Sequence, residues 1–213
     1  MAYELNGRVA QKQRTRDALI AATRQLVAEG AAPTVEAAAE AASISRTTAY
    51  RYFSSQRALL AAAHPETATE SMLPADAPAD VEARVAIVVA EYTAMIAGTE
   101  AQQRTLLRLS LEADPVERSQ LPLRQGRVIK WLEEALAPLQ DDMSAAELHR
   151  LAVAIRSATG IEALVWLTDV AGLSRDEAID LMRWSAGAML SAAITDHATR
   201  EGPKRGRAER ARR

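Results

Sequence analysis

Apolar side chains recur every three or four residues along most of the chain, which is the spacing of an amphipathic α-helix. Residues 11–29 follow this pattern and end before Gly30, so a helix is predicted there. Short helices are predicted next over residues 35–42, over residues 46–53 and from residue 55 onward. Each begins at a hydroxyl-bearing residue that can cap a helix, and these are Thr34, Ser45 and the pair Ser54-Ser55.

Beyond residue 63 the pattern predicts longer helices separated by proline-containing breaks. Residues 64–80 contain three prolines among Ser, Thr and Asp, and are interpreted as a helix end and a linker. Helices are predicted over residues 81–97 and 123–137. Residues 106–111 alternate apolar and polar side chains like a strand, but their helical neighbours favour a helix.

Two capping boxes mark the start of the last two predicted helices, Ser144 with Glu147 and Ser174 with Glu177. The first of these helices is expected to reach about residue 171 and the second about residue 198. Gly172 lies where a C-cap glycine belongs, so the connection is short and the two helices should form an antiparallel hairpin. No convincing strand remains, and alanine, the best helix former, is abundant. The predicted fold class is therefore all-α.

Charge and composition narrow the classes of function. The formal net charge is −2, but residues 1–60 hold eight Lys and Arg against five Asp and Glu, and residues 200–213 hold seven against two. Residues 61–199 hold eleven against twenty-one, so nucleic acid should be attracted to the two ends of the chain. The absence of cysteine excludes disulfides and thiolate metal sites. No secretory signal and no charge-free apolar run of about 18 residues is present, so a cytoplasmic protein outside the membrane is expected.

The residues from Thr34 to Leu60 carry the most specific pattern in the chain. Two short helices joined by a tight turn, with a longer helix before them and another helix after, form a helix-turn-helix arrangement. Small alanines allow the first short helix to lie close to the second, and Ile44 fills the turn. Ala49 and Phe53 are spaced to face the core, which leaves Arg46, Thr47, Thr48, Tyr50, Arg51 and Tyr52 for solvent or a partner.

Residues 39–53, Ala-Glu-Ala-Ala-Ser-Ile-Ser-Arg-Thr-Thr-Ala-Tyr-Arg-Tyr-Phe, resemble the N-terminal signature of the TetR family of transcriptional regulators. The resemblance is close over residues 11–60 and loose over the remaining helices. Three residues depart from the family pattern. Ser43 replaces the usual turn glycine, Tyr52 stands where His is commoner, and Gln56 stands where Lys usually opens the next helix.

The resemblance, together with side-chain chemistry, implies a set of DNA contacts. The first turn of the second short helix should meet base edges in the major groove, and there Arg46 alone can make a bidentate contact with guanine. Tyr50 and Tyr52 would contact phosphates, although packing at the edge of the core explains them equally well on chemistry alone. The full predicted DNA-binding set is Thr34, Ser45, Arg46, Thr47, Thr48, Tyr50, Arg51, Tyr52 and Gln56.

The resemblance also implies two domains, a DNA-binding helix-turn-helix domain over residues 1–62 and a helical ligand-binding and dimerisation domain over residues 63–198. The composition of residues 199–213 predicts a basic tail without regular structure. The last hairpin is apolar on several faces and is expected to pair with a second subunit. A charge introduced at Leu164 or Met189 should then weaken dimerisation. A helix buried inside one subunit is the alternative.

A small-molecule effector is implied by the resemblance alone. The side chains predicted to line its pocket, each equally explicable as core, are Tyr92, Met95, Leu107, Arg108, Leu111, Trp131, Glu162 and Trp166. Arg108 and Glu162 are charges among apolar helices and need a ligand, solvent or each other.

Two hypotheses about function follow from the sequence. The first is a ligand-responsive transcriptional regulator, a repressor, that binds an inverted-repeat operator in double-stranded DNA as a homodimer. The second is an all-helical small-molecule-binding or catalytic protein whose N-terminal helices are only structural. The three histidines are widely separated and no nucleotide-binding glycine loop occurs, so no metal, cofactor or catalytic residue is predicted.

Overall fold

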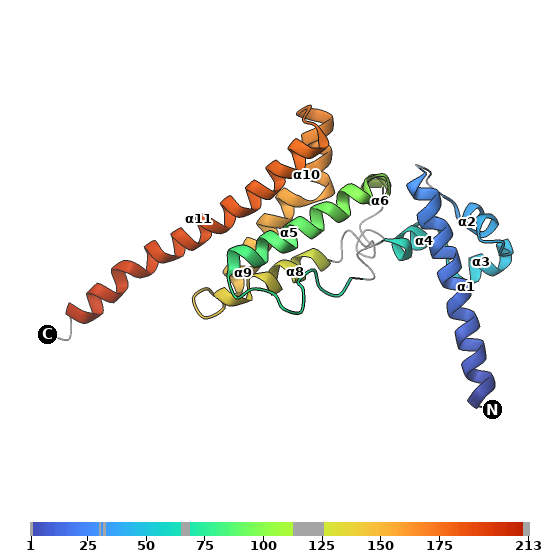
Figure 1. The fold of residues 1–213 in the computed structure, drawn as a ribbon, viewed down its shortest axis with the longest axis horizontal. Coiled ribbons are helices and arrows are strands. Elements are labelled where there is room, and N and C mark those ends of the chain that lie inside the picture. Colours follow the sequence, from blue (N-terminus) through green and yellow to red (C-terminus); the bar gives the residue numbers. More distant parts are fainter. Residues whose placement is uncertain (1, 30, 32, 65–68, 113–125, 211–213) are drawn as a thin grey trace. The chain divides into compact units, whose positions relative to one another are not determined.

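The computed structural model describes the backbone of residues 2–29, 31, 33–64, 69–112 and 126–210 (Figure 1). Side chains are described within these ranges from residue 9 to residue 200. The described residues form helices and connecting turns without a β-strand, so the predicted all-α fold is confirmed. The chain divides into two compact units, residues 1–69 with 99–125 and residues 70–98 with 126–213. The segment boundaries expected near residues 62 and 198 stay a prediction.

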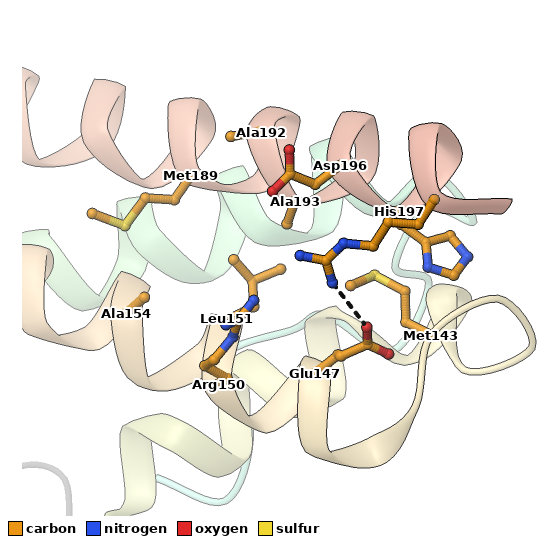
Figure 2. Close-up of a pocket in the computed structure, with 11 residues that line it drawn as sticks. Met143, Glu147, Arg150, Leu151, Ala154, Met189, Ala192, Ala193, Asp196 and His197 are labelled. Atoms are coloured by element: carbon orange, nitrogen blue, oxygen red, sulfur yellow. Dashed lines mark ion pairs between the residues drawn. The ribbon is translucent and has the colours of Figure 1, made fainter. Parts of the chain in front are cut away.

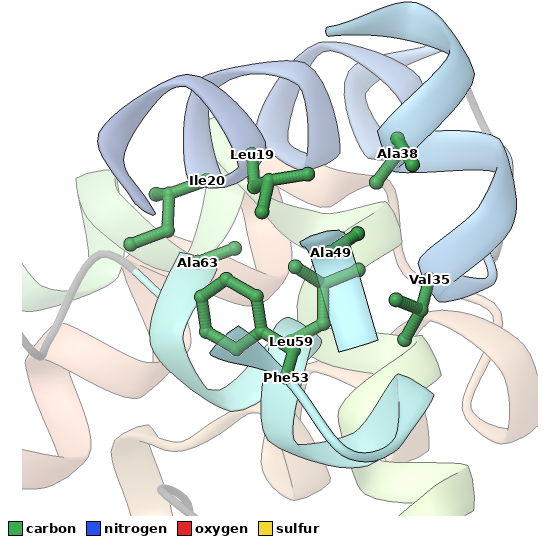
Figure 3. Packing of buried hydrophobic residues seen from close by; sticks show 9 residues of the cluster. Leu19, Ile20, Val35, Ala38, Ala49, Phe53, Leu59 and Ala63 are labelled. Carbon is green, nitrogen blue, oxygen red and sulfur yellow. The ribbon is translucent and has the colours of Figure 1, made fainter. Parts of the chain in front are cut away.

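The first unit consists of five helices over the described residues. They are α1 (Ala2–Ala28), α2 (Val35–Ala41), α3 (Arg46–Tyr52), α4 (Gln56–Ala63) and α6 (Glu100–Glu112). Figure 3 shows the core that joins the first four, in which Leu19, Ala38, Ala49 and Leu59 are fully buried beside Phe53. Helix α6 packs on this unit through Leu106, which is buried with Val27 and Leu60.

The three predicted N-caps are confirmed. The side-chain oxygens of Thr34, Ser45 and Ser55 each accept a hydrogen bond from the backbone N–H three residues later, at 3.2, 3.3 and 3.1 Å. Each bond satisfies a donor that the first turn of a helix otherwise leaves without a partner. The boundaries of α2, α3 and α4 are therefore encoded locally, and they fix where the short helices begin.

The turn between α2 and α3 places Ser43 in the left-handed region, with φ 55°. Its N–H donates to the carbonyl of Glu40 at 3.0 Å, and the N–H of Ile44 donates to the carbonyl of Ala39 at 2.8 Å. These two bonds form a Schellman motif, in which the residue after the C-cap is left-handed and usually glycine. The serine that replaces the family's glycine therefore adopts the conformation that disfavours any residue with a Cβ atom.

We expect Ser43→Gly to raise the free energy of unfolding by about 0.5–1 kcal/mol, because glycine adopts a left-handed conformation without the steric cost and its larger unfolded-state entropy offsets only part of the gain. Thermal and urea unfolding monitored by circular dichroism would measure the change. Ser43→Ala is the matched control, since alanine retains the Cβ atom. Equal stability of the glycine and alanine variants would show that the turn is not strained.

The second unit is a bundle of longer helices. It contains α5 (Val81–Gly98), α8 (Arg127–Ala135), η3 (Ala137–Leu139), α9 (Ala145–Thr159), α10 (Ile161–Val165), the π-helical turn η4 (Trp166–Val170) and α11 (Arg175–Arg210). Helix α11 packs against α5 and α9, and α8 packs against α5 and α9. The start of α9 lies beside the far part of α11, where Arg200 Nη1 is 3.8 Å from Glu147 Oε1. The two helices are therefore antiparallel, as predicted.

The prediction of one continuous helix over residues 144–171 is wrong, because the helix breaks at Gly160. This glycine has extended backbone angles, φ −85° and ψ 175°, and separates α9 from α10. Arg156 Nη1 lies 3.1 Å from Glu162 Oε2 beside the break. A Cβ atom at residue 160 would overlap both of these side chains. The glycine at residue 160 thus leaves room for the side chains of Arg156 and Glu162 to meet beside the backbone. The helical pattern of the sequence alone could not reveal this contact.

Both predicted capping boxes are present. The carboxylate of Glu147 accepts from the N–H and hydroxyl of Ser144 at 3.0 and 2.7 Å, and that of Glu177 accepts from Ser174 at 2.8 and 2.6 Å. These bonds hold the pKa values of both glutamates below the usual range, because they stabilise the ionised form. Gly172, with φ 76°, turns the chain between η4 and α11 as the C-cap pattern predicts.

The end of α11 also differs from the prediction. The helix continues to Arg210, whereas residues 199–213 were expected to lack regular structure. Arg, Ala, Glu and Lys, which are good helix formers, make up most of this extension, and they prolong a helix that is already formed. The helix continues through Gly202, Pro203 and Gly206, which are poor helix formers and are part of the reason that composition predicted no regular structure.

Residues 145–170 are long and apolar enough, by length and composition alone, to cross a membrane, with a mean hydropathy of 1.4 in the relevant window. Within that window 44% of the residues are buried inside the protein. The break at Gly160 and the packing of α9 against α8 and α11 match a core helix.

Candidate nucleic-acid interface

The first turn of α3 presents polar side chains from a well-fixed backbone. The hydroxyl of Ser45 accepts from the backbone N–H of Thr48 and donates to its Oγ1 at 2.8 Å. Arg46 and Thr47 are exposed, with 72% of the Arg46 side chain accessible. Ser45, Arg46 and Thr47 are all exposed, and Ala49 is the first buried residue of the helix. The first turn of α3 therefore lies at the surface of the unit.

The opposite side of α3 is anchored in the core of the first unit. Ala49 is fully buried and Phe53, at its C-terminal end, is 4% exposed. Burial of these side chains fixes the rotation of the helix about its axis. The residues on its other sides, Arg46, Thr47, Tyr50 and Arg51, are consequently accessible.

A three-residue cluster joins α2 to α3 on this accessible side. The hydroxyl of Tyr50 donates to Glu36 Oε1 at 2.6 Å, and Arg46 Nη2 lies 2.8 Å from the same oxygen. The Arg46 guanidinium also lies over the Tyr50 ring, 5.7 Å from its centroid. We call Glu36, Arg46 and Tyr50 the recognition-helix cluster.

The cluster changes the acidity of two of its members. The hydrogen bond from Tyr50 is the main cause that lowers the pKa of Glu36, and the same bond raises the pKa of Tyr50 because it stabilises the neutral phenol. Glu36 is therefore ionised and Tyr50 protonated at neutral pH. A negative charge stands among the side chains predicted to meet DNA.

The remaining predicted DNA-binding residues lie in different environments. Tyr52 is half-buried and packs against the core of the first unit, as in the alternative reading of this residue. Thr34 is exposed at the start of α2, and Arg51 is exposed on α3. Gln56 is half-buried and donates from Nε2 to the carbonyl of Pro33 at 3.2 Å. The structure therefore brings Arg46 and Tyr50 together, and it fixes Gln56 against the chain that precedes α2.

Sequence reasoning missed Glu36. An acidic residue in the first turn of a helix is favoured by the helix dipole, so nothing local distinguishes it from an ordinary helix start. Its partners lie 10 and 14 residues away on another helix. The only signal was an acidic residue among basic and polar ones in a segment predicted to bind a polyanion.

The side chains predicted to line an effector pocket are scattered. Leu107, Arg108 and Leu111 lie on α6 of the first unit, where Leu111 is 66% exposed and Arg108 pairs with Glu112 at 3.0 Å. The other five belong to the second unit. Tyr92 is buried on α5 with Met95 half-buried beside it, Trp131 is buried and donates to the carbonyl of Glu70, and Trp166 is 58% exposed. Glu162 pairs with Arg156 within the second unit, at 3.1 Å.

Two cavities of about 360 Å³ each lie in the second unit, and neither is lined by those eight residues. Figure 2 shows the first, between α9 and α11, where Met143, Leu151 and Met189 lie among Arg150, Asp196 and His197. The second lies between α5 and α11 and is lined mainly by small and aliphatic side chains beside Glu82 and Arg183. The effector-pocket residues stay a prediction.

Within the described part of the chain, no three His, Asp or Glu side chains are grouped as a metal site requires. Residues 19–63 match the model of the family described as bacterial regulatory proteins, tetR family. No curated protein matches the chain. The matched segment runs from the middle of α1 to the end of α4 and contains the whole recognition-helix cluster.

Proposed function

We propose that the chain, whose residues 19–63 match the tetR family of bacterial regulatory proteins, is a DNA-binding transcription regulator of that kind, and that it is a cytoplasmic, ligand-responsive repressor that binds an inverted-repeat operator as a homodimer. Its action is binding rather than catalysis. Two copies of α3 would enter successive major grooves, and an effector in the second unit would change their separation.

The exposed polar face of α3 supports the proposal most strongly. A three-helix unit that serves only as structure has no need for an exposed arginine and an exposed threonine, Arg46 and Thr47, at the first turn of a helix whose other side is buried. Arg46 would read guanine through O6 and N7, and the methyl groups of Thr47 and Thr48 suit thymine methyls. Ser45 lies in the same turn, and Thr34, Arg51, Tyr52 and Gln56 would contact the sugar-phosphate backbone, which positions the domain without reading sequence. Tyr50 would face the DNA beside Arg46 while it keeps its hydrogen bond to Glu36.

Exposed aromatic and aliphatic side chains on the last helices support the homodimer. Trp166 on η4 is 58% exposed, and Trp184 on α11 is 69% exposed. Val153 and Val170 are exposed too, while Leu181 lies one turn from Trp184. A second copy of the same surface would cover them. Leu164, by contrast, is 1% exposed within one subunit, so a charge there would test folding rather than dimerisation.

Selection of bound sequences from random double-stranded DNA tests the proposal. We expect enrichment of an inverted repeat whose half-site centres are separated by about one helical turn, roughly 34–36 Å, or a small multiple of it. Titration of the selected operator and a scrambled duplex at several salt concentrations gives both affinities. Equal affinity for the two duplexes would contradict sequence-specific regulation.

A further inference from the structure

We propose that Glu36 is a specificity-determining residue that restrains Arg46 and Tyr50 from binding non-operator DNA; the inference rests on the proposed function. One carboxylate oxygen of Glu36 accepts from both side chains, at 2.8 and 2.6 Å. Both residues are exposed on α3 and belong to the predicted DNA-binding set. In the free protein both are therefore held by an anion of the protein itself.

Non-specific and operator DNA make different demands on these side chains. Non-specific binding depends on neutralising phosphates, so Arg46 and Tyr50 would have to leave Glu36 and turn toward the DNA backbone. The carboxylate of Glu36 would then lose its partners and would be repelled by the phosphates, which are also negatively charged. Both effects weaken non-specific binding.

Operator binding leaves the cluster in place. A guanidinium has five N–H donors, and the ion pair of Arg46 with Glu36 is made from Nη2. The remaining donors can face guanine O6 and N7 while Glu36 keeps the side chain in one orientation. The Tyr50 ring beneath the guanidinium, 5.7 Å from Cζ, limits its movement further. Glu36 thus lowers affinity for DNA in general more than affinity for the operator, and it acts on the bases as a positioning residue through Arg46.

Glu36→Gln tests the inference in the full-length protein. The amide has nearly the same shape but no charge, and it cannot hold Arg46 as the carboxylate does. On scrambled DNA we expect binding about three- to tenfold tighter at low salt, with the slope of log affinity against log salt steeper by about one, as one additional phosphate contact gives. The ratio of operator to scrambled affinity should fall by at least about threefold.

Two further variants separate the contact from other effects of the substitution. Glu40→Gln removes the same charge from an exposed residue of the same helix, and it should leave both the ratio and the salt slope unchanged. Glu36→Asp retains the negative charge that stabilises the first turn of α2, so we expect this variant to fold. Its shorter side chain weakens the contacts with Arg46 and Tyr50. We expect it to shift the ratio in the same direction as Glu36→Gln.

Each outcome decides the inference. If the wild-type protein binds operator and scrambled DNA alike, the proposed function fails and the inference fails with it. If the wild-type protein discriminates but both Glu36 variants keep its ratio and slope, only the inference is overturned. An equal effect of Glu40→Gln would also overturn it, because general charge and not the shared contact would then be responsible.

Discussion

Trp184→Glu should convert the protein to a monomer at micromolar concentration and lower operator affinity by about a hundredfold or more. Trp184 is one of the most exposed large apolar side chains in the described structure, at 69%, and lies one turn from the exposed Leu181 on α11. A tryptophan at the centre of an interface typically contributes at least about 2 kcal/mol to association, and a buried carboxylate adds a desolvation penalty. Light scattering measures the oligomeric state, and titration of the operator measures the affinity.

Operator affinity should fall with dimerisation because the two half-sites are bound together. A monomer contacts one half-site and loses the gain that joining two binding modules provides. Leu111→Glu is the matched control, since it places the same charge on an exposed apolar side chain of α6 in the first unit. A dimeric Trp184→Glu protein with unchanged helicity would place the interface elsewhere.

Arg46→Ala should weaken operator binding by about 1–3 kcal/mol, roughly 5- to 150-fold, and relax the preference at one base pair of each half-site. Arg46 is exposed in the first turn of α3, and it is the residue there whose planar donors match guanine O6 and N7. The measurement is titration of operators carrying each base pair at every half-site position. Unchanged affinity and unchanged preference would show that α3 reads DNA with another face.

Tyr52→Phe provides the contrast to Arg46→Ala. The ring of Tyr52 packs against the core of the first unit, and phenylalanine keeps that packing while removing the hydroxyl. If the hydroxyl contacts a phosphate, operator and scrambled DNA should be weakened by the same factor, because phosphates carry no base identity. An effect on neither duplex would assign Tyr52 to packing alone.

Much of this structure can be predicted from the sequence, because many of the interactions that define it join residues only three or four positions apart. The N-caps Thr34 and Ser45 form bonds that span three residues, and so do the two capping boxes. Ala49 and Phe53, four residues apart, determine which side of α3 is buried. Helix periodicity and capping therefore predicted the helix-turn-helix before any tertiary contact was known. Of the residues left for solvent or a partner, Arg46, Thr47, Tyr50 and Arg51 are exposed, whereas Thr48 and Tyr52 are half-buried. The match of residues 19–63 to the tetR family rests on the same segment.

Other features depend on contacts between residues far apart in the chain, which no local pattern encodes. Leu106 packs with Leu60, 46 residues earlier in the sequence, and with Val27, and this packing brings α6 to the other helices of the first unit. The break at Gly160 accompanies the approach of Arg156 to Glu162 and replaces one predicted helix with two. Burial of Leu164 and exposure of Trp184 are likewise set by which helices pack together, since both residues have the same apolar character in the sequence.

The recognition-helix cluster also depends partly on local sequence and partly on tertiary structure. The sequence by itself placed Arg46 and Tyr50 on one accessible side of α3, because residues i and i+4 of a helix share a side. Only the tertiary structure placed the carboxylate of Glu36 between them, since that depends on how α2 crosses α3. Small residues allow α2 and α3 to cross closely, since Ala38 of α2 and Ala49 of α3 are fully buried in the same core of the first unit. Close packing of alanines brings the helices near enough for one glutamate to reach both side chains.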